Sequence, residues 1–221
     1  MNVLLFGATG MIGQGALREC LRAPEVRQVL AVGRSASGQR HEKLADLVTR
    51  ELADLSPYAR QLTGFDACFF TLGATAVGMA EEEYSRLTYD LTLSVARTLL
   101  KLNPDLTFIY VSGQGTDSTE RGRAMWARVK GRTENALLQL SERAYMFRPG
   151  LIVPLHGIRS RTTWYNVFYT IAKPLYPLLR RMAPGSVTTT ENLGHAMIVA
   201  VREKPPKHVL ETAEINTLAA R

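Results

Sequence analysis

The sequence is poor in cysteine, in long apolar runs and in leader-like segments, and each shortage removes a class of protein. Its two cysteines, Cys20 and Cys68, fall in a predicted helix and an apolar strand, which predicts small buried side chains in a reducing compartment and no disulfide. No apolar run reaches the roughly 18 residues that a membrane-spanning helix needs. The N-terminus, "MNVLLFGATG", carries no basic leader, so no signal peptide is expected and the predicted location is cytoplasmic.

Clustered charge and metal-ligand patterns are also missing. Basic residues outnumber acidic ones, 27 to 20, for a net charge of +7, but they are scattered. The densest basic group consists of Arg159, Arg161, Arg180 and Arg181. No long like-charge run or RNA-binding aromatic motif accompanies it, so nucleic-acid binding is not expected. The histidines, at positions 41, 156, 195 and 208, have no ligand spacing, and no metal is predicted.

What the sequence does contain is a regular alternation of apolar strands and amphipathic helices. Predicted strands lie at 2–6, 26–34, 47–50, 66–75, 105–113, 144–150 and 207–212, and predicted helices at 11–23, 81–101 and 122–141. This alternation predicts an α/β fold, a doubly wound (Rossmann-type) and mostly parallel sheet with helices on both faces. At 221 residues the chain predicts a single domain, 1–221, with residues 154–190 as an irregular cap over the substrate side of the cleft.

Three glycines directly follow the first predicted strand. The stretch "GATGMIG" spaces Gly7, Gly10 and Gly13 by three residues and opens an amphipathic helix. Gly7 permits a tight turn, Gly10 lets the backbone approach a pyrophosphate, and Gly13 lets the helix pack on the sheet. Free N–H groups at the helix start would bind the phosphates. A plain tight turn is the alternative, but the strand–loop–helix context favours a dinucleotide site.

The second predicted strand ends at an arginine where an acidic residue would favour NAD(H). Arg34 offers a forked cation suited to the 2′-phosphate of NADP(H), and Ser35, Ser37 and Arg40 could add donors. NADP(H) is therefore the preferred cofactor and NAD(H) the alternative. A solvated loop arginine is the competing interpretation.

With these residues in place, the chain resembles the short-chain dehydrogenase/reductase superfamily. It looks most like the atypical branch of NAD(P)-binding, epimerase-like proteins, near the Tat-interacting-protein type of oxidoreductase. The motifs that carry the resemblance run along nearly the whole chain and are "FGATGMIG", "FFTLGAT", "RELAD", "YVSG", "KGRTEN" and "FRPG".

The resemblance implies two sets of site residues. For the cofactor it implies the loop and helix start, an acidic residue near the adenine, the segment after the fourth strand, and the turn beside the nicotinamide: Gly7, Thr9, Gly10, Met11, Ile12, Gly13, Arg34, Glu51, Leu72, Gly73, Lys130, Pro149 and Gly150. For catalysis it implies Ser112 and Lys130, with Lys130 also holding the nicotinamide ribose. Trp126 stands where the family's catalytic tyrosine is expected, four residues before Lys130.

Tryptophan cannot replace tyrosine in proton transfer, because its indole N–H donates a hydrogen bond but does not titrate usefully. Three hypotheses follow. Another group, Tyr89, His156 or Tyr165, takes over the proton in an oxidoreductase or epimerase-like enzyme acting on a small apolar or aromatic carbonyl compound. Alternatively, the protein is a non-catalytic NADP(H)-binding sensor or scaffold. In the third, residues 163–182, which combine aromatic and basic side chains, contact a membrane surface. The competing interpretation of that segment is a pocket lid or a subunit contact.

Two further patterns concern helix ends and assembly. Residues 188–190, three threonines before Glu191, predict a helix N-cap, and residues 117–120 predict a capping loop. The helices at 81–101 and 122–141 are those that the resembled superfamily often pairs between subunits, so monomer and homodimer both remain open.

Overall fold

A parallel seven-stranded sheet forms the centre of the computed structural model, which describes residues 1–158 and 185–221. The strand order is β3-β2-β1-β4-β5-β6-β9, and every pairing is parallel. The strands are β1 (Asn2–Phe6), β2 (Gln28–Gly33), β3 (Leu44–Val48), β4 (Ala67–Phe70), β5 (Thr107–Val111), β6 (Ala144–Arg148) and β9 (Val209–Glu211). The predicted doubly wound fold is confirmed, because the order reverses between β1 and β4.

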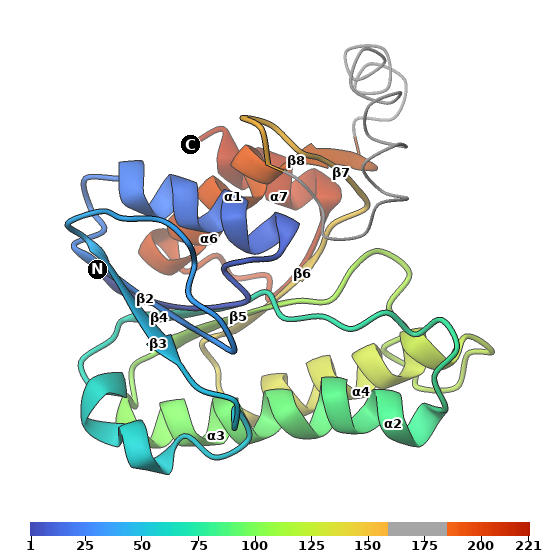
Figure 1. Cartoon of the computed structure of the whole chain (residues 1–221). Coiled ribbons are helices and arrows are strands. Elements are labelled where there is room, and N and C mark those ends of the chain that lie inside the picture. The colour runs from blue at the N-terminus through green and yellow to red at the C-terminus, as the bar shows by residue number, and fades with distance from the viewer. Residues whose placement is uncertain (159–184) are drawn as a thin grey trace.

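Helices cover both faces of this sheet (Figure 1). On one face lie α1 (Met11–Arg22), α6 (Thr190–Glu203) and α7 (Thr212–Ala219). On the other lie α2 (Glu81–Ser85), α3 (Leu91–Leu102) and α4 (Met125–Leu140). A short 3₁₀ helix, η1 (Ser56–Leu62), links β3 to β4.

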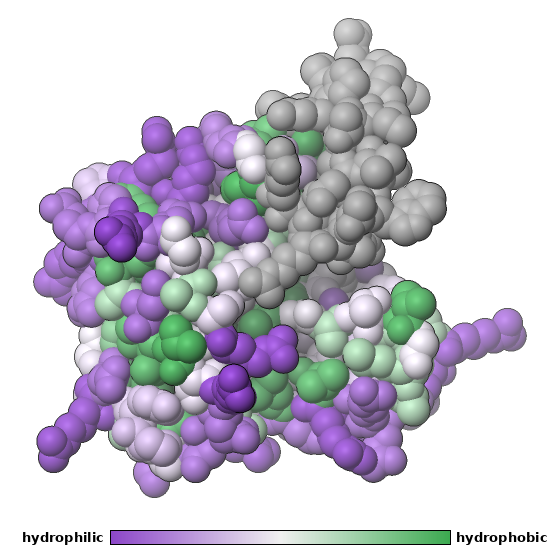
Figure 2. All heavy atoms as spheres, in the orientation of Figure 1, coloured by the Kyte–Doolittle hydropathy of each residue, from purple (hydrophilic) through white to green (hydrophobic). Residues whose placement is uncertain are grey.

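The core divides along β1 by simple alternation. Val3 and Leu5 belong to the cluster under α1 and α6, whereas Leu4 and Phe6 belong to the cluster under α3. All four are fully buried, which is why this strand reads as a continuous apolar run. Figure 2 shows a largely hydrophilic surface on the side seen in Figure 1, with hydrophobic groups gathered near the middle of the face.

The predicted helix at 81–101 is interrupted. A π-helical turn, η2 (Arg86–Asp90), separates α2 from α3. A spacing of four residues in this stretch predicts one apolar face through Leu87, Leu91, Val95 and Leu99, and that prediction is wrong at its start, since Leu87 is 46% exposed. The wider turn rotates the following residues relative to those before it, so a fixed spacing of four no longer follows one face.

Other boundaries differ at the ends of the sheet. The third strand begins at Leu44 and ends at Val48, earlier than the predicted 47–50, because it pairs with β2 from Val29 to Gly33. A second, two-stranded parallel sheet, β7 (Leu151–Val153) and β8 (Val187–Thr189), was not predicted. The predicted N-cap is confirmed: the hydroxyl of Thr189 accepts a 3.0 Å hydrogen bond from the Asn192 N–H.

Several sequence predictions lie outside the described residues. They are the middle of the cap at 154–190, the membrane-contact segment at 163–182, Tyr165, and the arginines at 159, 161, 180 and 181. The described ends of the cap segment are residues 154–158 and 185–190, and the latter contribute β8 and the first residue of α6.

Within residues 1–158 and 185–221, no helix is both long and apolar enough to cross a membrane. In the same residues, no group of three or more His, Cys, Asp or Glu side chains is placed to hold a metal ion. Both cysteines are free and buried, and burial raises the pKa of each thiol.

Candidate nucleotide-binding site

The glycine loop joins β1 to α1 with geometry that only small residues allow. Gly7 has φ +88°, and its carbonyl accepts a 2.9 Å hydrogen bond from the Gly10 N–H. A Cβ on Gly13 would lie 2.0 Å from the Gly7 oxygen, so the helix could not approach the loop this closely with a larger residue. No side chain caps α1 at Gly10, which leaves the helix N-terminus available to an anion.

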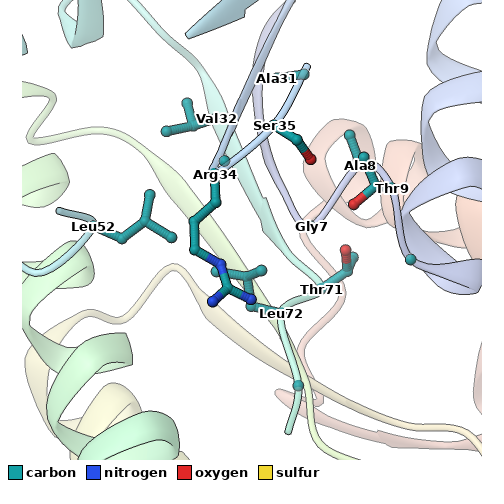
Figure 3. A pocket seen from close by; sticks show the side chains of 13 residues that line it. Gly7, Ala8, Thr9, Ala31, Val32, Arg34, Ser35, Leu52, Thr71 and Leu72 are labelled. Atoms are coloured by element: carbon teal, nitrogen blue, oxygen red, sulfur yellow. The ribbon is translucent and has the colours of Figure 1, made fainter. Parts of the chain in front are cut away.

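A cavity of about 190 Å³ lies over this loop, between the carboxyl ends of β1, β2 and β4. Its lining residues are Gly7, Ala8, Thr9, Gly10, Ala31, Val32, Gly33, Arg34, Ser35, Leu52, Thr71, Leu72 and Gly73. Figure 3 shows the hydroxyl groups of Thr9, Ser35 and Thr71 around the space beside Gly7. Met11 and Ile12, by contrast, pack against the hydrophobic core below α1.

Arg34 follows β2 directly and extends across the cavity towards Leu72 (Figure 3). Its side chain is exposed and forms no ion pair with any described residue. A guanidinium group in this position can bind an anion without first breaking an internal salt bridge.

A second cavity of about 790 Å³ continues from the first, with Arg34, Leu52, Leu72 and Gly73 in both linings. Its other lining residues are Arg50, Glu51, Ala53, Ala74, Thr75, Met79, Arg86, Leu87, Asp90, Leu91 and Ser94. The structure thus places Glu51, Leu72 and Gly73 beside one continuous space. Sequence reasoning missed Leu52, which directly follows Glu51, and Thr71, which directly precedes Leu72.

The residues predicted for catalysis lie elsewhere, at a corner formed by the carboxyl ends of β5 and β6 and the first turns of α4. Ser112 is 4% exposed, and its hydroxyl donates a 2.5 Å hydrogen bond to the Glu134 carboxylate. The same hydroxyl lies 3.2 Å from the Phe147 carbonyl oxygen. Because the Ser112 hydroxyl already donates its hydrogen bond to this carboxylate, it cannot donate to a substrate oxygen until that bond breaks.

Lys130 is brought next to Ser112 by the first turns of α4. Its ammonium group donates a hydrogen bond to the Ser112 carbonyl oxygen. Burial lowers the pKa of Lys130, and the Glu134 carboxylate partly opposes that shift. Pro149 and Gly150 lie next to these residues. The Pro149 carbonyl accepts a 2.9 Å hydrogen bond from the Gln114 N–H, and the Gly150 N–H donates a 2.8 Å hydrogen bond to the Thr212 hydroxyl.

Sequence reasoning missed the ion pair that holds this corner together. Glu134 is fully buried, and the Arg148 Nε lies 3.0 and 3.1 Å from its two oxygens. Arg148 also donates to the Ser118 hydroxyl at 2.5 Å and to Glu211 at 3.3 Å. Hydrogen bonding to Glu134 raises the pKa of Arg148. One arginine thus joins β6, α4, β9 and the loop after β5.

Trp126 lies in the first turn of α4, half-buried, with its ring against Gly115 of the loop after β5. Of the three alternative proton donors, Tyr89 and His156 have other partners, and Tyr165 lies outside the described residues. The Tyr89 ring packs under the Arg132 guanidinium at 4.0 Å, and His156 pairs with Glu191 at 2.5 Å.

The predicted site residues therefore fall into two groups. One group lines one or both cavities and consists of Gly7, Thr9, Gly10, Arg34, Glu51, Leu72 and Gly73, whereas Met11, Ile12 and Gly13 line neither. Ser112, Trp126, Lys130, Pro149 and Gly150 cluster at the ends of β5 and β6 and line neither of these two cavities.

No protein-family model matches the chain. Among curated proteins, it is 30% identical over 159 residues to "Protein fmp52, mitochondrial" of Emericella nidulans, covering 68% of this chain and 66% of that protein. It is 26% identical over 223 residues to the protein of the same name in Eremothecium gossypii, covering 99% of this chain and 97% of the relative. A third relative, "Leucinostatins biosynthesis cluster protein T" of Purpureocillium lilacinum, is 30% identical over 146 residues, covering 63% of this chain and 52% of that protein. The chain thus spans about half the length of this relative and about two-thirds of the Emericella nidulans protein.

These names correct one expectation. The prediction of a cytoplasmic location is contradicted, because the fungal relatives are named as mitochondrial proteins. The composition of the first ten residues and the scarcity of long apolar runs were too weak a basis for assigning a compartment.

Solved structures share the fold at low sequence identity. The Bordetella bronchiseptica enzyme WbmF in complex with NAD⁺ matches with a TM-score of 0.67 and 15% identity, covering 98% of this chain and 76% of that one. YwfH, an NADPH-dependent reductase involved in bacilysin biosynthesis, matches with a TM-score of 0.65 and 12% identity, covering 96% and 97%. The chain therefore has the Rossmann fold of the epimerases and short-chain reductases, while its closer relation to the Tat-interacting-protein type stays a prediction.

Proposed function

We propose that this protein binds NADP(H) with its adenosine and pyrophosphate in the two joined cavities, the pyrophosphate on the glycine loop and the 2′-phosphate at Arg34, and with its nicotinamide end extending beyond them towards Lys130. The observation that carries the proposal is the close approach of α1 to the loop, where a Cβ on Gly13 would lie 2.0 Å from the Gly7 oxygen. Such a loop presents backbone N–H groups to a diphosphate. The Arg34 guanidinium, exposed and unpaired among the described residues, favours the phosphorylated cofactor over NAD(H).

The reaction proposed is that of an oxidoreductase or epimerase-like enzyme on a small apolar or aromatic carbonyl compound. The bound cofactor would supply or accept a hydride. Lys130 would turn its ammonium group from the Ser112 carbonyl to the ribose hydroxyls, and Pro149 and Gly150 would border the nicotinamide. Ser112 would polarise a substrate oxygen only after its hydroxyl leaves Glu134.

A second function is favoured by one specific observation. The Ser112 proton is committed to Glu134, and Trp126 offers no titrating group. A chain with a nucleotide-binding loop that has, among its described residues, neither the usual tyrosine nor an unengaged Ser112 hydroxyl suits a non-catalytic NADP(H) sensor or scaffold, in which cofactor occupancy biases a partner-binding state.

Two measurements test the proposal, the first for the cofactor that both functions share and the second for the difference between them. The first is NADPH and NADH affinity in the wild type and in Arg34→Ala. Selective loss of NADPH affinity is the expected result, and equal loss for both cofactors would contradict the role of Arg34.

The second is cofactor oxidation with a panel of apolar and aromatic carbonyl compounds. Turnover that Ser112→Ala abolishes supports the enzyme. Turnover that Ser112→Ala leaves intact would remove Ser112 from the reaction, and binding without turnover of any compound favours the sensor.

A further inference from the structure

A second arginine leaves the sheet beside Arg34. β2 and β3 pair in parallel with Gly33 opposite Val48, and the Thr49 N–H donates a 2.9 Å hydrogen bond to the Gly33 carbonyl. This register brings Arg34 and Arg50 out of neighbouring strands at the same edge of the sheet. Both side chains line the 790 Å³ cavity.

The charges around this cavity are not equivalent. Arg86 also lines it, but its guanidinium is paired with Glu82 at 2.5 Å. Arg34 and Arg50 form no ion pair with any residue in the described part of the chain. Glu51 and Asp90 line the same cavity, so an anion would be bound by direct contact with the two uncommitted guanidinium groups rather than by the net charge of the lining.

The apolar part of the same lining limits what that anion is attached to. Leu52 is 7% exposed and, with Leu72 and Leu91, gives the cavity an apolar wall. A flat heterocycle can pack on such a wall while an attached phosphate reaches the cavity rim. Free inorganic phosphate would use the cations but gain nothing from these leucines.

We infer that Arg50 is a specificity-determining residue that binds the 2′-phosphate of the adenosine moiety jointly with Arg34. The inference rests on the proposed NADP(H) function and adds a residue that the strand-end pattern at Arg34 does not reveal. A phosphate monoester carries close to two negative charges and several acceptor oxygens, so two guanidinium groups can bind it from adjacent strands.

The test compares Arg50→Ala, Arg34→Ala and the double variant, with Arg60→Ala as the matched control. Arg60 is exposed on η1 and lines neither cavity. Titration calorimetry of the full chain would use four probes: NADPH, NADH, adenosine 2′,5′-bisphosphate and AMP. Thermal unfolding of each variant would check that the substitution leaves the fold intact.

Arg50→Ala should weaken NADPH and adenosine 2′,5′-bisphosphate binding by about tenfold or more, as for loss of a charge-assisted hydrogen bond. NADH and AMP affinity should change by less than about twofold, because neither carries a 2′-phosphate. The double variant should bind NADPH no better than NADH. Arg60→Ala should match the wild type for all four probes.

Three results would overturn the inference. Equal weakening of NADPH and NADH would place Arg50 on a part shared by both cofactors. Unchanged NADPH affinity would leave Arg34 as the 2′-phosphate ligand without Arg50. An equal loss in Arg60→Ala would reduce the effect to net charge. Failure of the proposed function looks different, because then no variant, nor the wild type, binds any of the four probes.

Discussion

Replacing Arg148 by methionine should destabilise the fold far more than an ordinary loss of a salt bridge. Its partner Glu134 is 0% exposed, and the Arg148 side chain itself is 11% exposed. Removing one member of a buried pair leaves an uncompensated charge and typically costs about 3–5 kcal/mol. For a chain of this size, about 2–4 °C is lost per kcal/mol, so the melting temperature should fall by roughly 6–20 °C.

The assay is guanidinium unfolding at fixed pH, supported by calorimetric melting, with Arg143→Met as the matched control. Arg143 pairs with Asp105 at 2.9 Å, but the Asp105 side chain is 89% exposed. An exposed pair of this kind contributes about 0–1 kcal/mol. The double variant Glu134→Gln/Arg148→Met should recover much of the stability, because it removes the orphaned charge together with its partner.

If Arg148→Met costs no more than Arg143→Met at neutral pH, the account of Arg148 as the residue that joins α4, β6 and β9 is refuted.

Two other substitutions test the glycine loop and the N-cap of α6. Gly13→Ala should cost about 1–3 kcal/mol and abolish nucleotide binding, because its Cβ would lie 2.0 Å from the Gly7 oxygen; Gly10→Ala, with a contact of 3.3 Å, is the milder control. Equal nucleotide affinity in the wild type and Gly13→Ala, measured by calorimetry, would remove the loop from the binding site. Thr189→Ala should cost about 1 kcal/mol in urea unfolding by removing the N-cap bond to Asn192, and an unchanged midpoint would contradict that role.

The fold was predictable wherever the signal was local. Apolar strands, amphipathic helices and the glycine spacing after β1 predicted the doubly wound parallel sheet and the glycine loop, because each of these patterns involves a few consecutive residues. The π-helical turn at 86–90 was not predictable from a spacing of four, since one wider turn changes which side chains face inward. The three-residue strands β7 and β8 are too short to show a period.

The site was predictable only in part, and for a physical reason. Ser112 and Lys130 could be located by resemblance, but the hydroxyl of Ser112 is held by Glu134, 22 residues away, and Glu134 is held by Arg148. Such contacts depend on how β5, α4 and β6 pack, and no local pattern contains them. Arg50 was hidden for the same reason, because its place beside Arg34 follows from the register of β2 and β3.

The most direct test of the central claim is a calorimetric titration of the purified chain with NADPH. Saturable binding of one NADPH per chain, tighter than binding of NADH, is the predicted result, since the glycine loop and the unpaired arginines face one continuous cavity. Absence of binding for NADPH, NADH and both oxidised forms would contradict the account and leave the loop as a purely structural turn.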